Sequence, residues 1–232
     1  MASSDPSLKY YLANRMIPAV RIPSKSKIVH FVRHAQGEHN VVGEVNHEEY
    51  KREDLEDAHL SELGRQQCQQ LFERSSQNRT VDDAELLVVS PMRRTLQTAQ
   101  LSFPHLVGNI PWIALESVRE QTGQHPCDRR RPVVEHQSDH SHVDFESIEN
   151  ETDPFYHLYP DCREPVTVVA DRGRDFFKWL AARPERVIIV VTHSAYLRVL
   201  LTHVAAAHSD FHESHFDNCE MRTYALDLSG LV

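Results

Sequence analysis

The feature that most constrains the fold of this chain is a set of short apolar runs, each followed at once by charged or polar residues. The runs and the segments that follow them are Lys27 to Val32 before RHAQGEHN, Glu85 to Val89 before SPMRRTLQTA, Ile110 to Leu115 before VREQTG, and Val187 to Val191 before THSAYLR. Ligands bind open α/β sheets at the edge where the parallel strands end. The sequence therefore predicts one sheet edge at which these four segments meet.

The apolar runs alternate with segments of helical pattern. We expect strands at Lys27 to Arg33, Glu85 to Val89, Ile110 to Leu115, Val187 to Val191 and Thr223 to Leu228. We expect helices at Ser61 to Arg74, Pro91 to Ser102, Pro165 to Ala182 and Ala195 to Ala207. Such alternation predicts the α/β class, a three-layer α/β/α sandwich with a mostly parallel central sheet.

One helix start bears on the site. Ser90 followed by Pro91 has the pattern of an N-cap and a first helical residue, which places Arg94 in the first turn, within reach of the sheet edge. Arg93 is one residue away and points about 100° from Arg94. We expect Arg93 to face solvent or the rim of a substrate site.

Two long segments break the alternation, Val41 to His59 and Gln121 to Glu164. Loops of this length within a compact domain are usually lids or binding segments. We expect both to cross the sheet edge. A chain of 232 residues with 40% hydrophobic residues can bury one core. We expect one domain over residues 1–232, with residues 1–26 as an extension and 121–164 as a lid insertion.

Composition indicates which kind of ligand and which cellular compartment to expect. The net charge of −9 disfavours nucleic acid and acidic membranes, which leaves a small molecule as the expected ligand. The N-terminus lacks a continuous apolar core of the signal-peptide type, and no stretch reaches the roughly 18 apolar residues of a membrane helix. A cytoplasmic protein, also compatible with the nucleus, is expected. The four cysteines form no CxxC pair and are expected to be reduced thiols.

Arg33 and His34 together suggest phosphoryl chemistry. A neutral imidazole, with an ordinary pKa of about 6.5, can attack phosphorus, and the neighbouring guanidinium attracts the phosphate oxygens. The dipeptide alone is equally compatible with a strand that ends in a solvated Arg and a buried His. The other segments decide between these readings.

RHAQGEHN resembles the RHG signature of the histidine phosphatase superfamily, also called phosphoglycerate mutase-like. SPMRRTLQTA is similar to the family's SxLxRAxQTA segment, THS to its second-histidine motif and LSELGRQQCQQL to its LTxxGxxQA helix. The order and spacing also match, from about Lys27 to Leu228. The later segments HPCDRR and NCEMR resemble a eukaryotic branch of small phosphatase-like members more than the glycolytic mutases.

The resemblance implies a phosphoglycerate mutase-like fold and a role for each matching residue. His34 would take the phosphoryl group, Arg33 and Arg94 would clamp its oxygens, and His193 would hydrogen-bond to it. Glu120 would protonate the leaving oxygen. A rival for this role is Glu116, which is expected on the preceding strand. The expected substrate contacts are Asn40, Gln36 and Ser194, although for Gln36 a brace of the loop through its amide is the preferred interpretation. Since the two arginines supply positive charge, no metal and no cofactor are implied.

Two residues depart from the family pattern, because Ala35 and Ser194 stand where glycine is usual. Ala35 fits only if its φ is negative, whereas the hydroxyl of Ser194 could donate to a phosphate oxygen. If Ala35 does not fit, the pocket is partly blocked and the chain would be a degenerate enzyme.

The sequence does not decide the role of several charged clusters. The triplet Arg129 to Arg131, and Arg222 near the last strand, fit a solvated face or a contact with the non-reacting part of the substrate. The histidines within His136 to His142, and His208, His212 and His215, lack the HExxH or paired-cysteine spacing that would indicate a metal site.

Three functions follow in order of preference. The first is a metal-independent phosphomonoesterase acting on a small phosphorylated metabolite through a phosphohistidine. The second is mutase-type phosphoryl transfer, and the third is a phosphate-binding protein without turnover. Either a monomer or a homodimer is compatible with the sequence.

Overall fold

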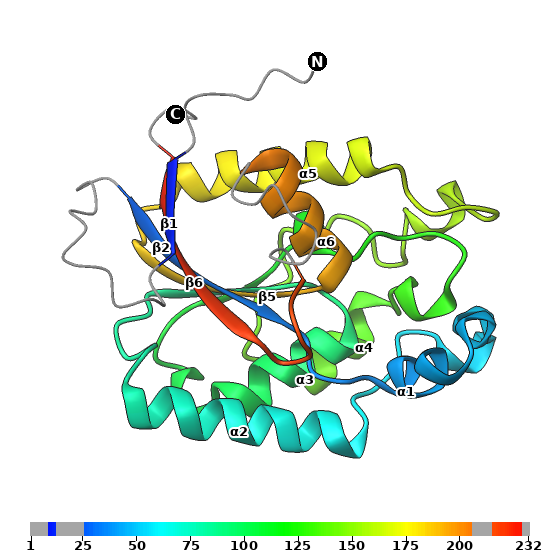
Figure 1. The fold of residues 1–232 in the computed structure, drawn as a ribbon, viewed down its shortest axis with the longest axis horizontal. Helices are drawn as coiled ribbons and strands as arrows, with labels where there is room; N and C mark the ends of the chain where they lie inside the picture. The colour runs from blue at the N-terminus through cyan, green and yellow to red at the C-terminus, as the bar shows by residue number, and fades with distance from the viewer. Residues whose placement is uncertain (1–8, 13–25, 206–214, 229–232) are drawn as a thin grey trace.

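A central β-sheet organises the computed structural model, which describes residues 9–12, 26–205 and 215–228 (Figure 1). The strands are β1 (Lys9–Leu12), β2 (Lys27–Arg33), β3 (Leu86–Val89), β4 (Trp112–Ala114), β5 (Val187–Thr192) and β6 (Met221–Asp227), in the order β1-β6-β2-β5-β3-β4. The four neighbouring strands β2, β5, β3 and β4 run parallel, while β6 is antiparallel to β2 and to β1. The prediction of an α/β fold with a mostly parallel sheet is confirmed.

The pairing of β2 with β5 brings two of the predicted segments together. Arg33 pairs with Thr192 at the carboxyl ends of the two strands, and the backbone N–H of His34 donates to the carbonyl of Thr192 at 2.8 Å. Because the strands are parallel and in this register, His34 and His193 leave the sheet side by side. The sheet-edge prediction holds for this pair.

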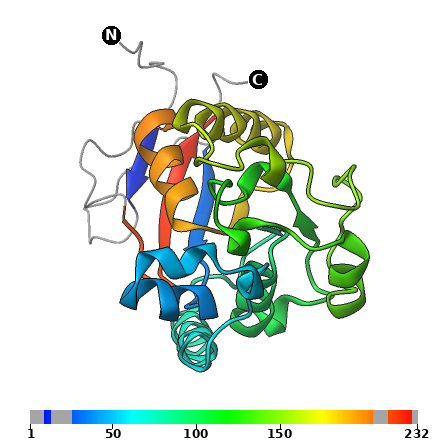
Figure 2. The same ribbon diagram turned by 90° about the vertical axis from the view of Figure 1, so that its right-hand side faces the viewer.

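Helices cover both faces of the sheet (Figures 1 and 2). They are α1 (Glu38–Val45), α2 (Glu62–Asn78), α3 (Arg93–Ser102), α4 (Val133–Asp139), α5 (Val166–Ala182) and α6 (Ser194–Val199), which continues into a π-helical turn at Leu200–Val204. Short 3₁₀ turns are η1 (His47–Lys51), η2 (Glu53–Leu55), η3 (Pro104–Leu106), η4 (Glu116–Val118), η5 (Pro126–Asp128) and η6 (Tyr156–Leu158). In Figure 1, α5 and α6 lie above the sheet and α2 and α3 below it.

Alternation along β5 explains why both faces are covered. Ile188 and Val190 pack into the cluster on the side of α5 and α6, and Ile189 and Val191 pack into the cluster on the side of α2 and α3. All four side chains are fully buried. A strand that is apolar on both faces requires helices on both faces, so the three-layer arrangement follows from these residues.

The predicted helices and strands are present with shifted ends, and the N-cap predicted for the second helix was wrong. The helix expected at Pro91 begins at Arg93, with Met92 rather than Ser90 as its N-cap. The buried carboxylate of Asp57 accepts from the backbone N–H of Arg93 at 2.8 Å and so supplies the missing cap. The helix expected at Ala195 begins at Ser194, and the last two residues of that prediction, 206–207, lie outside the described residues. Strand β1 was not predicted.

The two long segments run past the sheet edge, as expected, but they contain more helix than the sequence indicated. The first carries η1 and η2, and the second carries η5, α4 and η6. Arg129 joins them through its ion pairs with Glu53 and Glu56. Among the described helices, none has the length and apolar character needed to cross a membrane.

Candidate active site

His34 lies at the centre of the cavity at the sheet edge and is 3% exposed. Its Nδ1 lies 2.7 Å from the carbonyl oxygen of Ala35. Because a carbonyl only accepts, Nδ1 carries the proton and Nε2 presents a lone pair. Burial, and then the charge of Arg94, hold the pKa of His34 well below its ordinary value. The imidazole is therefore neutral and suited to nucleophilic attack.

Arg94 and Arg33 approach His34 from two elements. In the first turn of α3, Arg94 donates to the carbonyl of Cys127 at 2.5 Å and to the carboxylate of Asp128 at 2.9 Å. Arg33, at the end of β2, donates to the carbonyl of Phe216 at 2.7 Å. The Nε atom of each guanidinium is buried and has no hydrogen-bond partner. Arg33 and Arg94, which both line the cavity, thus each have one buried donor without a partner among the described residues.

His193 is fully buried next to His34, with ring centroids 5.2 Å apart. Its Nδ1 accepts from Arg94 at 3.2 Å, and its Nε2 lies 2.7 Å from the hydroxyl of Ser90. Burial and the charge of Arg94 hold the pKa of His193 well below its ordinary value. Ser90 therefore orients His193 rather than capping α3.

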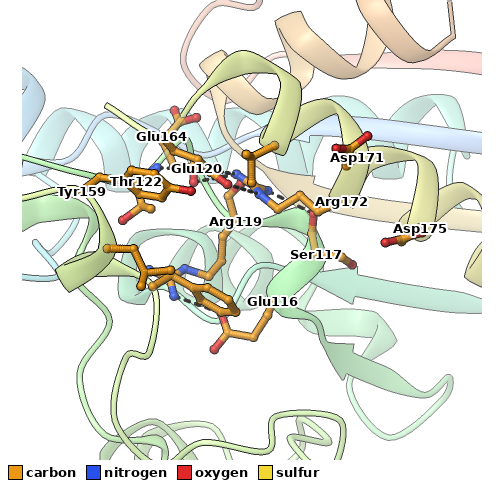
Figure 3. A pocket seen from close by; sticks show the side chains of 13 residues that line it. Glu116, Ser117, Arg119, Glu120, Thr122, Tyr159, Glu164, Asp171, Arg172 and Asp175 are labelled. Carbon is orange, nitrogen blue, oxygen red and sulfur yellow. Dashed lines mark hydrogen bonds and ion pairs between the residues drawn. The ribbon is translucent and has the colours of Figure 1, made fainter. Parts of the chain in front are cut away.

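Glu120 is held at the cavity wall by backbone N–H groups. Its carboxylate accepts from Tyr196 at 2.9 Å and Ala195 at 3.2 Å, at the start of α6, and from Gln121 at 2.9 Å. Arg172 of α5 fixes the loop itself, because it donates to the carbonyls of Arg119 and Glu120 (Figure 3). Glu116 lies in η4 rather than on the preceding strand, and pairs with Arg119 and Arg130.

The three predicted substrate contacts lie in different surroundings. Asn40 and Ser194 line the cavity, and Asn40 also accepts from the backbone N–H of Gly37 at 2.9 Å. Gln36 accepts from the hydroxyl of Ser61 at 2.7 Å, which is the bracing contact considered from the sequence. Ala35 is not among the described residues with positive φ, so the condition for alanine at this position is met.

The cavity has a volume of about 310 Å³ and contains residues that the sequence analysis missed. They are His39, His47, Tyr50, His125, Asp128, Arg163 and Arg198. His125 stacks on Tyr50, with ring centroids 5.3 Å apart. The carboxylate of Asp128 bridges Arg94 and Arg163, at 2.9 and 2.8 Å. The segment HPCDRR, which was noted for its family resemblance, contains both His125 and Asp128 and could have indicated them.

Other charged residues lie away from the cavity lining. Arg93 was expected to face solvent or the substrate rim, but it is 8% exposed and hydrogen-bonds to His59. Arg129 pairs with Glu53 and Glu56, and Arg131 pairs with Glu135. Arg130 is 2% exposed and pairs with Glu116. These arginines therefore connect loops.

The remaining clusters have structural contacts where they are described. Arg222 pairs with Glu220, and His136 lies 2.9 Å from the buried carboxylate of Asp57. Residues 9–12, 26–205 and 215–228 contain no group of three or more His, Cys, Asp or Glu arranged to hold a metal ion. His208 and His212 lie outside these ranges. The four cysteines are free.

Comparison with known proteins identifies the family of the chain. The profile of the histidine phosphatase superfamily (branch 1) matches residues 29–230. A phosphoglycerate mutase-like protein of Arabidopsis thaliana is 37% identical over 232 residues, covering 87% of this chain and 85% of the relative. A probable phosphatase of Schizosaccharomyces pombe is 27% identical, covering 75% and 76%.

Two solved structures share the fold. A putative α-ribazole-5′-P phosphatase from Escherichia coli superposes with a TM-score of 0.53 at 14% identity, covering 85% of this chain and 89% of the other. A mycobacterial glucosyl-3-phosphoglycerate phosphatase gives a TM-score of 0.52 at 18% identity, covering 85% and 89%. With a family profile that spans most of its length, the chain belongs to the histidine phosphatase superfamily (branch 1).

Proposed function

We propose that this protein is a metal-independent phosphomonoesterase that hydrolyses a small phosphorylated metabolite through a phosphohistidine at His34. Family membership and the phosphatase names of several relatives and structural neighbours support the reaction class. The proposal is finer than these names, because it assigns the nucleophile, the intermediate and the independence from metal. These parts depend on the geometry of the cavity.

The observation that carries the proposal is a group of buried donors without partners around one cavity. They are Nε of Arg33, Nε of Arg94 and Nε2 of His125. His125 accepts from Arg163 at Nδ1, so its Nε2 carries a proton. A buried donor without a partner costs about 1–3 kcal/mol. A phosphoryl group offers three acceptor oxygens, which would satisfy such donors.

The proposed reaction uses these groups in two displacements. The lone pair of His34 Nε2 attacks phosphorus, the bond from phosphorus to the leaving oxygen breaks, and Glu120 gives its proton to that oxygen. Water then attacks the phosphohistidine, Glu120 takes a proton from it, and the nitrogen–phosphorus bond breaks to release inorganic phosphate. Arg33 and Arg94 stabilise the charge on the equatorial oxygens in both steps.

The test is hydrolysis of p-nitrophenyl phosphate in the presence of EDTA. We expect the purified protein to be active and His34→Gln to lose all measurable activity. The matched control is His30→Gln, since His30 is also buried and on β2 but hydrogen-bonds to Thr223 away from the cavity. Full activity in folded His34→Gln would refute the nucleophile, and activity that disappears with EDTA would refute metal independence.

A further inference from the structure

A second cavity, which we call the Thr122 pocket, shares Glu120 with the cavity around His34 and is drawn in Figure 3. Its volume is about 470 Å³, and its walls come from η4, the loop at Thr122, η6 and α5. Phe155, Leu158 and Val168 line it and are 40%, 61% and 38% exposed. Apolar side chains this open to water are the expected lining of a site for an apolar group.

One residue of the pocket wall also has a polar atom without a partner. Thr122 is 3% exposed, lines the pocket, and has a buried hydroxyl oxygen without a hydrogen-bond partner. A hydroxyl both donates and accepts, so it can bind an amine or a hydroxyl of a ligand. Buried polar groups in folded proteins are nearly always paired. This unpaired hydroxyl is therefore a second, independent indication of a ligand.

The charge of the lining selects the kind of ligand. Acidic side chains outnumber basic ones, because Glu116, Glu120, Glu164, Asp171 and Asp175 face only Arg119 and Arg172. Both arginines already bind within the protein. Arg172 donates to Glu164 and to three backbone carbonyls, and Arg119 donates to Glu116, to Asp153 and to the carbonyl of Asp128.

The acids on α5 are less constrained. Among the residues that the structure describes, Asp171 pairs only with exposed Arg174, and Asp175 only with exposed Lys178. Exposed pairs of this kind are weak, worth about 0–1 kcal/mol. Their carboxylates are therefore available to a cation in the neighbouring pocket, whereas an anion would meet a net negative lining without a free guanidinium.

We propose that the Thr122 pocket binds a small amphipathic organic cation, with its apolar body against Phe155, Leu158 and Val168 and its amine toward Asp171 and Asp175. This preference is opposite to that of the cavity around His34, which offers donors to an anion. Glu120 lines both cavities, so the two sites share one wall. The proposal does not depend on turnover.

The test compares ligands that share a body but differ in charge. Tryptamine and tyramine are titrated into the full chain by calorimetry, and tryptophol and indole-3-acetate serve as the neutral and anionic counterparts. We expect saturable binding of the amines and about tenfold or more weaker binding of indole-3-acetate. The absence of saturable binding for both amines, or equal binding of indole-3-acetate, would overturn the proposal.

Variants locate the site. Asp171→Asn with Asp175→Asn, and separately Thr122→Val, are expected to weaken tryptamine binding several-fold. Asp82→Asn is the matched control, because Asp82 forms the same kind of exposed pair, with Arg79, but does not line the pocket. Binding should persist in His34→Gln and in saturating orthovanadate. Unchanged binding in both pocket variants, or displacement of tryptamine by vanadate, would show that the amine binds elsewhere.

Discussion

Arg94 is held in the proposed site by contacts with three other residues. Its guanidinium bonds to the carbonyl of Cys127, to the carboxylate of Asp128 and to His193, and its Nε remains unpaired. Asp128 in turn binds Arg163 from the long segment before α5. This chain of contacts holds the arginine in place before a substrate arrives, which lowers the cost of ordering it in the transition state.

Glu120 allows a test that separates proton donation from simple positioning. Removing a general acid typically costs about 10² to 10⁴ in rate. We expect Glu120→Gln to reduce kcat by about this factor for β-glycerol phosphate, whose alkoxide needs a proton. The effect on p-nitrophenyl phosphate should be far smaller, because p-nitrophenolate leaves without one. Steady-state kinetics on both substrates gives the ratio. An equal loss on both would assign Glu120 a structural role only.

At the residue scale, the sequence predicted several of the residues that line the cavity. Arg33, His34 and Arg94 come from segments far apart in the chain and line it, whereas His193 lies buried beside His34, with its ring nitrogens hydrogen-bonded to Arg94 and Ser90. Tyr50 and Arg163 were missed because they come from segments without apolar periodicity, and His39 was missed although it lies within RHAQGEHN. Arg93 was placed wrongly, since its burial depends on contacts with His59 and on the shifted start of α3.

At the scale of elements, the positions of strands and helices followed from local patterns, whereas distant pairings did not. The strands β2 and β5 are apolar runs that end at charged residues, and their predicted bounds differ from the observed ones by at most one residue. By contrast, β1 has only four residues and pairs with β6 at the other end of the chain, with Tyr10 opposite Leu226. Nothing near β1 in the sequence indicates that partner.

The start of α2 supports the loop that follows His34. Gly64 packs so closely that a Cβ there would lie 2.1 Å from the carbonyl oxygen of Gln36. Gly64→Ala should lower the free energy of unfolding by about 1–3 kcal/mol. Because the displaced loop joins His34 to Asn40, both of which line the cavity, KM for p-nitrophenyl phosphate should rise as well. Urea unfolding and steady-state kinetics measure the two effects.

Gly108→Ala is the control for this substitution. The φ of Gly108 is 76°, and a Cβ there would meet nothing within 4 Å. Backbone strain of about 1–2 kcal/mol is expected, without any change in KM. Gly108→Ala should leave KM unchanged. If Gly64→Ala also left KM unchanged, the start of α2 would not position the site.

At the scale of the whole molecule, the sheet edge buries three imidazoles, those of His34, His39 and His193. Burial, and then the charge of Arg94, hold the pKa of each well below its ordinary value. The unfolded chain, with histidine pKa values of about 6.5, therefore binds more protons than the folded protein below that pH. Stability must fall as the pH falls through this range.

The free energy of unfolding should therefore decrease between about pH 7.5 and pH 5.5, by up to about 1.4 kcal/mol per pH unit for each imidazole. Urea denaturation at several pH values measures this slope. His39→Asn should make this slope shallower by up to the contribution of one imidazole, about 1.4 kcal/mol per pH unit. A free energy of unfolding that is constant or rises toward acid would mean that these histidines are not held neutral.

The phosphohistidine is the central claim, and trapping it is the most direct measurement. The protein is mixed with a phosphorus-labelled monoester, quenched in alkali within milliseconds, digested and analysed by mass spectrometry. The account predicts an acid-labile phosphoryl group on the peptide that contains His34, present in the active protein and absent from His34→Gln. Turnover without any labelled protein, or a label on a different residue, would contradict it.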